Sequence, residues 1–115
     1  MQFVVIYRVP METMNQWKAT TSPEEMMKQG KELGDSMMAW QEKHKGSFVG
    51  TGLPLGKNTR MDKNGAQALS NDLNYMQVVE AESKEAVIEM FKDNPHIATI
   101  PDSFIDIMEV PHMGM

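Results

Sequence analysis

The sequence predicts an α+β protein of ferredoxin-like class: a βαββαβ order with an extra short hairpin, an antiparallel sheet, and two helices on one face. Apolar, β-branched runs near both ends of the chain and in its second half are typical of strands. Two segments between such runs begin with helix-capping residues, and an Asn-Gly pair is typical of a hairpin. With 115 residues, the chain (1–115) is expected to form a single domain.

The first strand is predicted from Phe3 to Val9, whose almost continuous apolar character indicates a central position with both faces covered. The polar stretch from Pro10 to Thr21 predicts a loop. Ser22 as N-cap, followed by proline and two glutamates, predicts a helix from Pro23 to Lys45. Gly46 is the expected C-cap of this helix, which carries one apolar stripe.

The middle of the chain is predicted to be short and turn-rich. A short strand at 47–50, a link at 51–56 and a second short strand at 57–62 precede the hairpin turn at Asn64-Gly65. Residues 66–72 form either the return strand or a loop. Leu73 to Glu80 then predicts a second central strand.

Ser83 is the expected N-cap of a second helix, from Lys84 to about Lys92. Pro95 ends this helix, and a stiff connection leads to the last strand, Phe104 to Val110. Crossover connections place both helices on one face of the sheet. The other face is then apolar and bare, which predicts a homodimer.

The formal charge of −5, from 11 basic and 16 acidic residues, argues against nucleic-acid binding. Without a membrane-length apolar run or a signal peptide, and with no cysteine, the chain is expected in the cytoplasm and off the membrane. Of the 13 methionines, those in the helical and strand patterns are interpreted as core fillers, namely Met26, Met27, Met37, Met38, Met76, Met90 and Met108, and no cofactor is expected. Three histidines without metal-binding spacing predict no metal site, and the tail residues His112, Met113 and Met115 are not assigned to copper.

Several segments in a characteristic order together resemble the YCII-related (DGPF-like) proteins: FVVIY, SPEEM, AWQEKHKG, TGLPL, NYMQVVEAESKEAVIEMFKDNPHI and SFIDIMEV. The resemblance extends over nearly the whole chain. It implies a ferredoxin-like fold and a dimeric α/β barrel, in which the sheets of two subunits face each other. It also implies a small-molecule ligand, because some members are dehydrochlorinases or other enzymes acting on small ring compounds.

The resemblance implies acid–base chemistry by a histidine and an aspartate in some members, but this sequence departs from that pattern. Gly34, Asp35 and Ser36 stand where the first-helix histidine is expected, and Asn94-Pro95 replaces an Asp-Pro pair. The preferred prediction is therefore a homodimer that binds a small aromatic or anionic ligand near the dimer seam. The alternative is an enzyme, of the dehydrochlorinase or another acid–base lyase type, that uses His96.

His96 is the candidate catalytic base, because an imidazole titrates near neutral pH and Asp93 or Asp102 lies close enough in sequence to orient it. A structural role in the turn is the alternative. Arg8 is a candidate for binding an anionic ligand, or else pairs with Asp106 on a neighbouring strand. The remaining ligand-binding candidates are Trp40, Tyr75 and Asp102, although the two aromatic residues also fit a core role.

Overall fold

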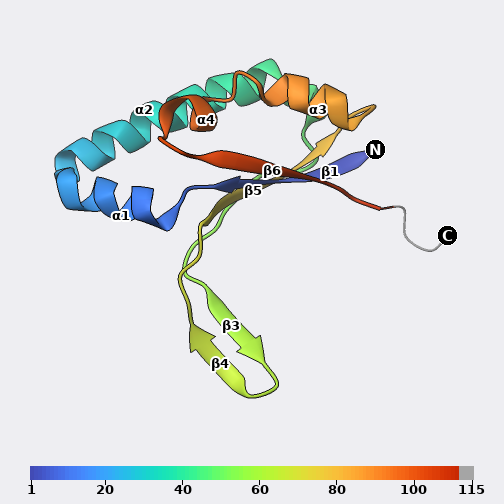
Figure 1. Ribbon diagram of the computed structural model, residues 1–115. Coiled ribbons are helices and arrows are strands. Elements are labelled where there is room, and N and C mark those ends of the chain that lie inside the picture. Colours follow the sequence, from blue (N-terminus) through green and yellow to red (C-terminus); the bar gives the residue numbers. More distant parts are fainter. Residues whose placement is uncertain (112–115) are drawn as a thin grey trace.

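The computed structural model describes residues 1–111, so the predictions for His112, Met113 and Met115 lie outside the described residues. Figure 1 shows the elements in chain order. They are β1 Gln2–Arg8, α1 Met11–Thr20, α2 Pro23–Lys43, a 3-10 turn at Lys45–Ser47, β2 Leu53–Pro54, β3 Thr59–Asp62, β4 Gly65–Ala68, β5 Leu73–Glu80, α3 Lys84–Phe91, α4 Pro95–Thr99 and β6 Phe104–Glu109.

Four strands form the main sheet in the order β2-β5-β1-β6, and β1 runs antiparallel to both of its neighbours. This order, with the β3–β4 hairpin inserted between β2 and β5, is consistent with a ferredoxin-like fold and confirms the predicted α+β class. β1 is central, as its continuous apolar character predicted. A register shift between Tyr7 and Arg8 opposite β5 leaves Asn74 as the extra residue of a bulge.

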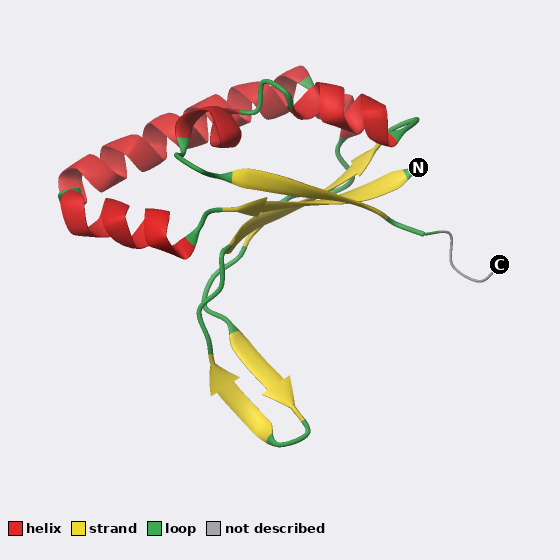
Figure 2. Ribbon diagram, viewed as in Figure 1, coloured by secondary structure: helices red, strands yellow, loops and turns green. Residues whose placement is uncertain are grey.

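Helices α2, α3 and α4 lie together on one face of the sheet (Figure 2). Side chains alternate along a strand, so every second residue of β1 and β5 meets this helix layer. The fully buried core consists of Phe3, Val5, Tyr7, Trp40, Val79, Val87 and Phe91. The predicted helix stripes therefore face the sheet, with Trp40 on α2 and Val87 and Phe91 on α3 at the centre of the packing.

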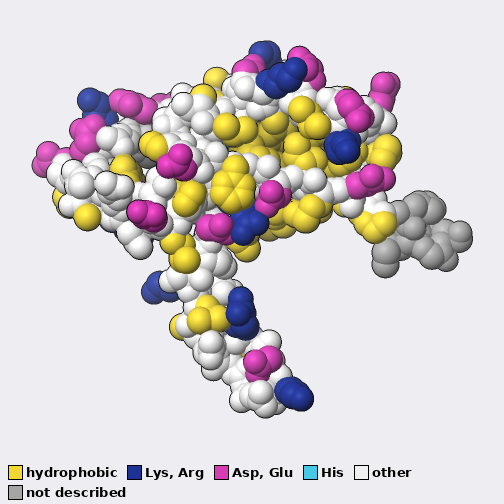
Figure 3. All heavy atoms as spheres, viewed as in Figure 1, with side chains coloured by type: hydrophobic (Ala, Val, Ile, Leu, Met, Phe, Trp, Pro, Cys, Tyr) yellow, Lys and Arg dark blue, Asp and Glu magenta, His cyan; other side chains and the backbone are white. Residues whose placement is uncertain are grey.

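Among residues 1–111, no helix covers the opposite face of the sheet. Register pairing places Val4, Val78 and Met108 side by side there, next to Ile6 and Met76. Figure 3 shows hydrophobic side chains gathered over the sheet and the helix layer, whereas the hairpin beneath them carries mostly polar and charged groups. The sequence-predicted bare apolar face is therefore present in the single chain.

The polar segment predicted as a loop contains a helix, α1. Met, Glu, Gln, Lys and Ala have high helix propensity, which outweighs the weak apolar pattern of this segment. Trp17 joins α1 to α2 by donating a 2.7 Å hydrogen bond from Nε1 to Oε1 of Gln29. The loop prediction was wrong because it relied on an apolar stripe, which a solvated helix does not need.

The stiff connection predicted around Pro95 contains a further short helix, α4. Asn94 caps it by accepting a 2.9 Å hydrogen bond at Oδ1 from the backbone N–H of His96. Pro95 occupies the first helical position, where its missing N–H costs nothing. The proline that was predicted to stop one helix therefore begins another.

Other boundaries differ less. Helix α2 ends at Lys43 with His44 as C-cap, and Gly46 lies in the 3-10 turn that follows. The predicted strand at 47–50 is reduced to a single bridge between Phe48 and Val79. The core-filling interpretation fails for Met27, Met38 and Met108, which are 77%, 70% and 47% exposed. Met27 and Met38 lie on α2 away from the core, and Met108 lies on the uncovered face of the sheet.

The predicted Asn-Gly hairpin is confirmed as β3–β4, and it projects away from the sheet (Figure 1). Gly65 has φ +127°, which a residue with a side chain rarely adopts, and Oδ1 of Asp62 accepts a 2.8 Å hydrogen bond from the N–H of Asn64. Within residues 1–111, no helix is both long enough and apolar enough to cross a bilayer.

Candidate functional site

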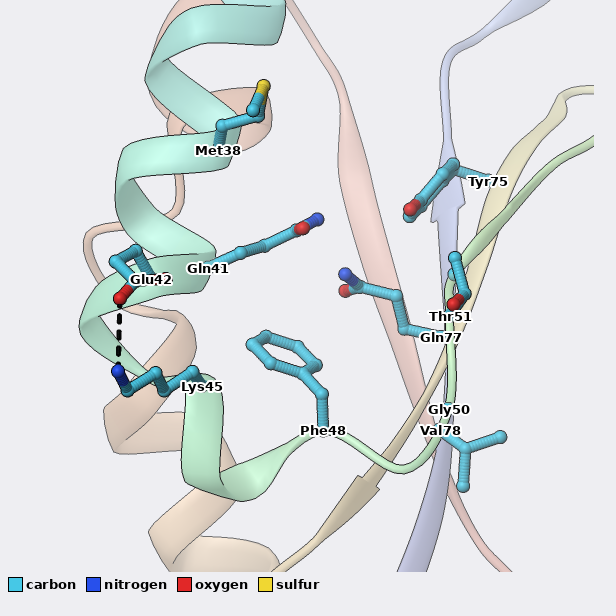
Figure 4. A pocket seen from close by; sticks show the side chains of 11 residues that line it. Met38, Gln41, Glu42, Lys45, Phe48, Gly50, Thr51, Tyr75, Gln77 and Val78 are labelled. Carbon is cyan, nitrogen blue, oxygen red and sulfur yellow. Dashed lines mark hydrogen bonds and ion pairs between the residues drawn. The ribbon is translucent and has the colours of Figure 1, made fainter.

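A cavity of about 380 Å³ lies between the C-terminal half of α2 and strand β5 (Figure 4). Its volume falls in the range of small-molecule sites. The lining combines two aromatic rings with neutral polar groups and a charged rim: Met38, Gln41, Glu42, Lys45, Phe48, Gly50, Thr51, Gly52, Tyr75, Gln77 and Val78. Such a lining suits a flat ring that carries hydrogen-bonding substituents.

The side chains that line the cavity come from the end of α2 with the turn after it, from the 48–52 segment and from β5. Figure 4 shows Gln41 reaching from α2 toward Gln77 on β5, with Phe48 beneath them and Tyr75 beyond, whereas Val78 points away. At the rim, Nζ of Lys45 donates a 3.2 Å hydrogen bond to Oε1 of Glu42, so these two charges compensate each other. The interior is therefore neutral, and Phe48 and Tyr75 supply its two aromatic rings.

Tyr75 holds its place in the wall because residue 52 is a glycine. A Cβ atom at Gly52 would overlap the phenol ring of Tyr75. On its other side, the Tyr75 ring packs edge-on against Tyr7, with centroids 5.4 Å apart. The close approach of the 50–52 segment to β5 thus closes one side of the cavity.

Behind the cavity wall lies a chain of buried hydrogen bonds. The hydroxyl of Tyr7 donates to Oε1 of Gln77 at 2.7 Å and accepts from Nδ2 of Asn94 at 3.0 Å. Burial raises the pKa of Tyr7 far above its ordinary value, and the hydrogen bond from Asn94 acts in the opposite sense. Tyr7 therefore remains a neutral phenol.

His96, the predicted catalytic residue, lies on α4 and is buried against β1. It does not line the cavity. Its Nε2 lies 3.3 Å from the backbone oxygen of Arg8, and its ring packs edge-on against Tyr7. Burial lowers the pKa of His96, while the contact with the Arg8 carbonyl raises it by a smaller amount. The contact that orients the imidazole is therefore a backbone carbonyl and not the expected carboxylate of Asp93 or Asp102.

Arg8 binds two carboxylates on the uncovered side of the sheet. Its Nε and Nη2 atoms donate to Oδ1 of Asp72 at 2.9 and 2.7 Å, and Nη1 donates to Oδ2 of Asp106 at 2.8 Å. These hydrogen bonds, first that to Asp106 and then that to Asp72, raise the pKa of Arg8. The predicted alternative, pairing with Asp106, is present in the structure, whereas Asp72 was not foreseen.

The other candidates lie apart from one another. Trp40 is only 4% exposed and packs in the core against Phe91, so it contacts the cavity only through Phe48. Asp102 is an exposed turn residue with φ 59° at the start of β6, a conformation that aspartate tolerates. Of the five predicted site residues, Tyr75 alone lines the cavity.

Sequence reasoning missed Gln41, Phe48 and Gln77. The sequence held a signal for Gln77, because it is a polar residue in the middle of the apolar run of a predicted central strand; the structure shows that it is 3% exposed. Buried polar side chains are almost always hydrogen-bonded, so a glutamine at such a position indicates a partner across the sheet. Gln41 gave no such signal, since polar residues are common on helices.

A second hollow of about 170 Å³ lies between α1 and the segment leading into β5, and its lining lacks aromatic rings. Within the described part of the chain, no three histidine or acidic side chains come close enough to hold a metal ion. The larger cavity is therefore the better candidate for a small organic ligand.

No family model matches this chain, and no curated protein gives a significant sequence match. Among solved structures, the fold is similar to that of 5-chloro-2-hydroxyhydroquinone dehydrochlorinase from Burkholderia phenoliruptrix, determined in complex with 2,5-dihydroxybenzoquinone. The TM-score is 0.51 at 16% sequence identity, and the match covers 92% of this chain and 91% of that one. At this identity the similarity establishes a shared fold and nothing beyond it.

Proposed function

We propose that the protein is a homodimeric, YCII-related (DGPF-like) protein that binds a small planar ring compound in the cavity between α2 and β5. The observation that carries the proposal is the lining of this cavity, which places Phe48 and Tyr75 beside the neutral polar groups of Gln41, Thr51 and Gln77. Aromatic walls provide stacking and apolar contact, and the amides and hydroxyl orient ring substituents. The quinone complex of the structurally similar dehydrochlorinase supports the same ligand class.

The dimer in this proposal forms through the uncovered face of the sheet. Leu53 pairs with Met76 on that face and is 52% exposed, and it directly follows the cavity-lining segment 50–52. A second sheet packed on this face would therefore reach the cavity rim. That arrangement supports a ligand site close to the dimer seam.

Binding without turnover is favoured over the enzymatic alternative. Within residues 1–111, the cavity lining contains no histidine or aspartate, and its one acid, Glu42, is paired with Lys45. His96 is separated from the cavity by Tyr7 and Asn94. If ring compounds are nevertheless converted, replacement of His96 by asparagine should abolish the conversion, and full activity of a folded His96→Asn protein would rule out this role.

The proposal is tested by titrating the protein with small ring compounds, beginning with 2,5-dihydroxybenzoquinone, and following backbone amide shifts by NMR. Ligand binding should shift the amides of residues 48–52 and 75–78. Thr51→Trp should fill the cavity and abolish these shifts. Asn15→Trp, which places the same side chain in the smaller hollow, serves as the matched control and should leave them unchanged. Equal binding by both variants would place the ligand elsewhere.

A further inference from the structure

The chain of buried hydrogen bonds behind the cavity has a defined direction. It begins at the backbone N–H of His96, passes through Asn94 and the hydroxyl of Tyr7, and ends at Gln77, which lines the cavity. Asn94, Tyr7 and Gln77 are 0%, 1% and 3% exposed, so water does not replace these bonds. Each group in the chain consequently constrains the hydrogen-bonding role of the next.

The backbone N–H of His96 determines the orientation of the first side chain, Asn94. A backbone N–H can only donate, so the Asn94 atom that lies 2.9 Å from the N–H of His96 must be the oxygen Oδ1. The amide nitrogen of Asn94 then faces Tyr7 and can only donate, at 3.0 Å, to the phenol oxygen. Capping of α4 thus determines the orientation of the Asn94 side chain.

The Tyr7 hydroxyl in turn determines which atom of Gln77 faces it. Its oxygen accepts from Asn94, and within residues 1–111 the one other group bonded to this hydroxyl is Gln77. The single phenol proton therefore lies in the 2.7 Å bond to Gln77, and the facing atom is the acceptor Oε1. Because burial raises the pKa of Tyr7, this proton is retained throughout the physiological pH range. The only side-chain hydrogen bond that Gln77 makes within residues 1–111 is this one, which leaves its Nε2 group for the cavity.

We infer that Gln77 presents a fixed hydrogen-bond donor to the cavity, so that the ring compound bound there carries an acceptor oxygen, either a carbonyl or an oxyanion, facing Nε2. The inference rests on the proposed ligand site and specifies the chemistry of its occupant. A ring that offers only an N–H donor at this position meets another donor, and the buried amide cannot turn without breaking the bond from Tyr7. Figure 4 shows the end of Gln77 directed at the space between Gln41 and Phe48.

Two probes of equal size test this polarity. 4-Pyranone and aniline are both flat six-membered rings with one exocyclic heteroatom, which is a pure acceptor oxygen in the first and, in the second, a donor nitrogen whose lone pair is delocalised into the ring. The ratio of their dissociation constants is measured by NMR titration in the unmodified protein, in Gln77→Leu and in Tyr7→Phe. Relative to Gln77→Leu, the unmodified protein should favour 4-pyranone by roughly three- to tenfold, the value of one hydrogen bond.

Tyr7→Phe removes the bond that orients Gln77, so either end of the amide can face the ligand and the preference should fall toward that of Gln77→Leu. Asn15→Leu is the matched control, because Asn15 lies in the smaller hollow, outside both the cavity and the chain of buried bonds, and it should retain the preference. A ratio that is the same in the unmodified protein and in Gln77→Leu overturns the inference while leaving the ligand site intact. If neither probe nor 2,5-dihydroxybenzoquinone binds to the unmodified protein, the proposed function fails as well.

Discussion

Trp40 and Asp93, 53 residues apart in the chain, are joined by a 3.1 Å hydrogen bond from the indole Nε1 to the carboxylate Oδ1. The other oxygen of Asp93 accepts a 2.8 Å hydrogen bond from Nζ of Lys43. The end of α2 is thereby tied to the turn that follows α3. Trp40 also forms the core beside the cavity, so this tie helps to position the cavity wall.

The tie should make stability depend on pH in the acid range. Hydrogen bonds from Lys43 and then from Trp40 lower the pKa of Asp93 in the folded protein. The stabilisation is therefore present above the ordinary aspartate pKa of about 4 and is lost as pH falls through the lowered folded value. Asp93→Asn should be less stable than the unmodified protein at pH 7, and the difference should shrink below pH 4.

Urea unfolding at a series of pH values measures this difference. Asp35→Asn is the matched control. Asp35 pairs with Lys31 on the exposed surface of α2, so its replacement should change the unfolding free energy very little. If the difference in unfolding free energy between Asp93→Asn and the unmodified protein stays constant down to pH 2, the charge of the Asp93 carboxylate does not contribute to stability.

His96 should cause a separate loss of stability as the pH falls below about 6.5, the ordinary pKa of histidine. Its pKa is lowered in the folded protein by burial, so the unfolded chain binds the proton more readily. Stability should be unaffected by this group above about pH 6.5 and should fall as pH drops from there toward the folded value. NMR titration of the imidazole C–H signals should give a midpoint below 6.5, and His96→Asn should lack the corresponding slope. A midpoint at or above that of an unfolded peptide would contradict the expectation.

Gly52→Ala should damage the cavity wall. The added Cβ overlaps the ring of Tyr75, which is held from the other side by Tyr7, so one of these groups must move. Forcing an extra carbon into a packed site costs about 1–3 kcal/mol, and displacement of Tyr75 should also weaken ring binding. Gly56→Ala is the control, because its Cβ would enter open space. Equal unfolding free energies for the two variants would mean that Tyr75 moves without cost.

Val78→Asp should disrupt the proposed dimer. Val78 pairs with Val4 on the uncovered face, where an added charge would be buried by a second sheet. Sedimentation should give twice the mass of one chain for the unmodified protein and a lower mass, or unfolding, for Val78→Asp. Met27→Asp, a similar change at an exposed position on α2, should leave the mass unchanged. A monomeric unmodified protein at micromolar concentration would exclude sheet-to-sheet association.

Local sequence signals located most of the regular elements. Ser22 and Ser83 cap α2 and α3 as predicted, since capping depends on a side chain and a backbone N–H only three residues away. The strand Leu73–Glu80 has the predicted bounds, because its apolar run is flanked by polar turn residues. Where local signals conflicted, as at Pro95, the sequence could not tell the end of α3 from the start of α4.

The candidate site was less accessible to sequence reasoning. Tyr75 was foreseen as an aromatic residue on a central strand, but its place in the cavity depends on Gly52, which approaches it from the edge of the sheet. Arg8 and His96 were singled out for their chemistry, yet their partners come from segments more than 60 residues away. The strand pattern foresaw Asp106 as a partner of Arg8, whereas periodicity and spacing carry no information about Asp72 or about the backbone contact of His96.

The sequence by itself determined where β5, β6, α2 and α3 begin, because those choices rest on contacts within one or two turns of chain. It also determined that one face of the sheet would be apolar without a helix over it. Only the tertiary structure decided that Tyr7 meets Gln77 and Asn94, 70 and 87 residues further along the chain. Strand register and helix packing bring these polar groups together, and burial then makes each hydrogen bond determine the direction of the next.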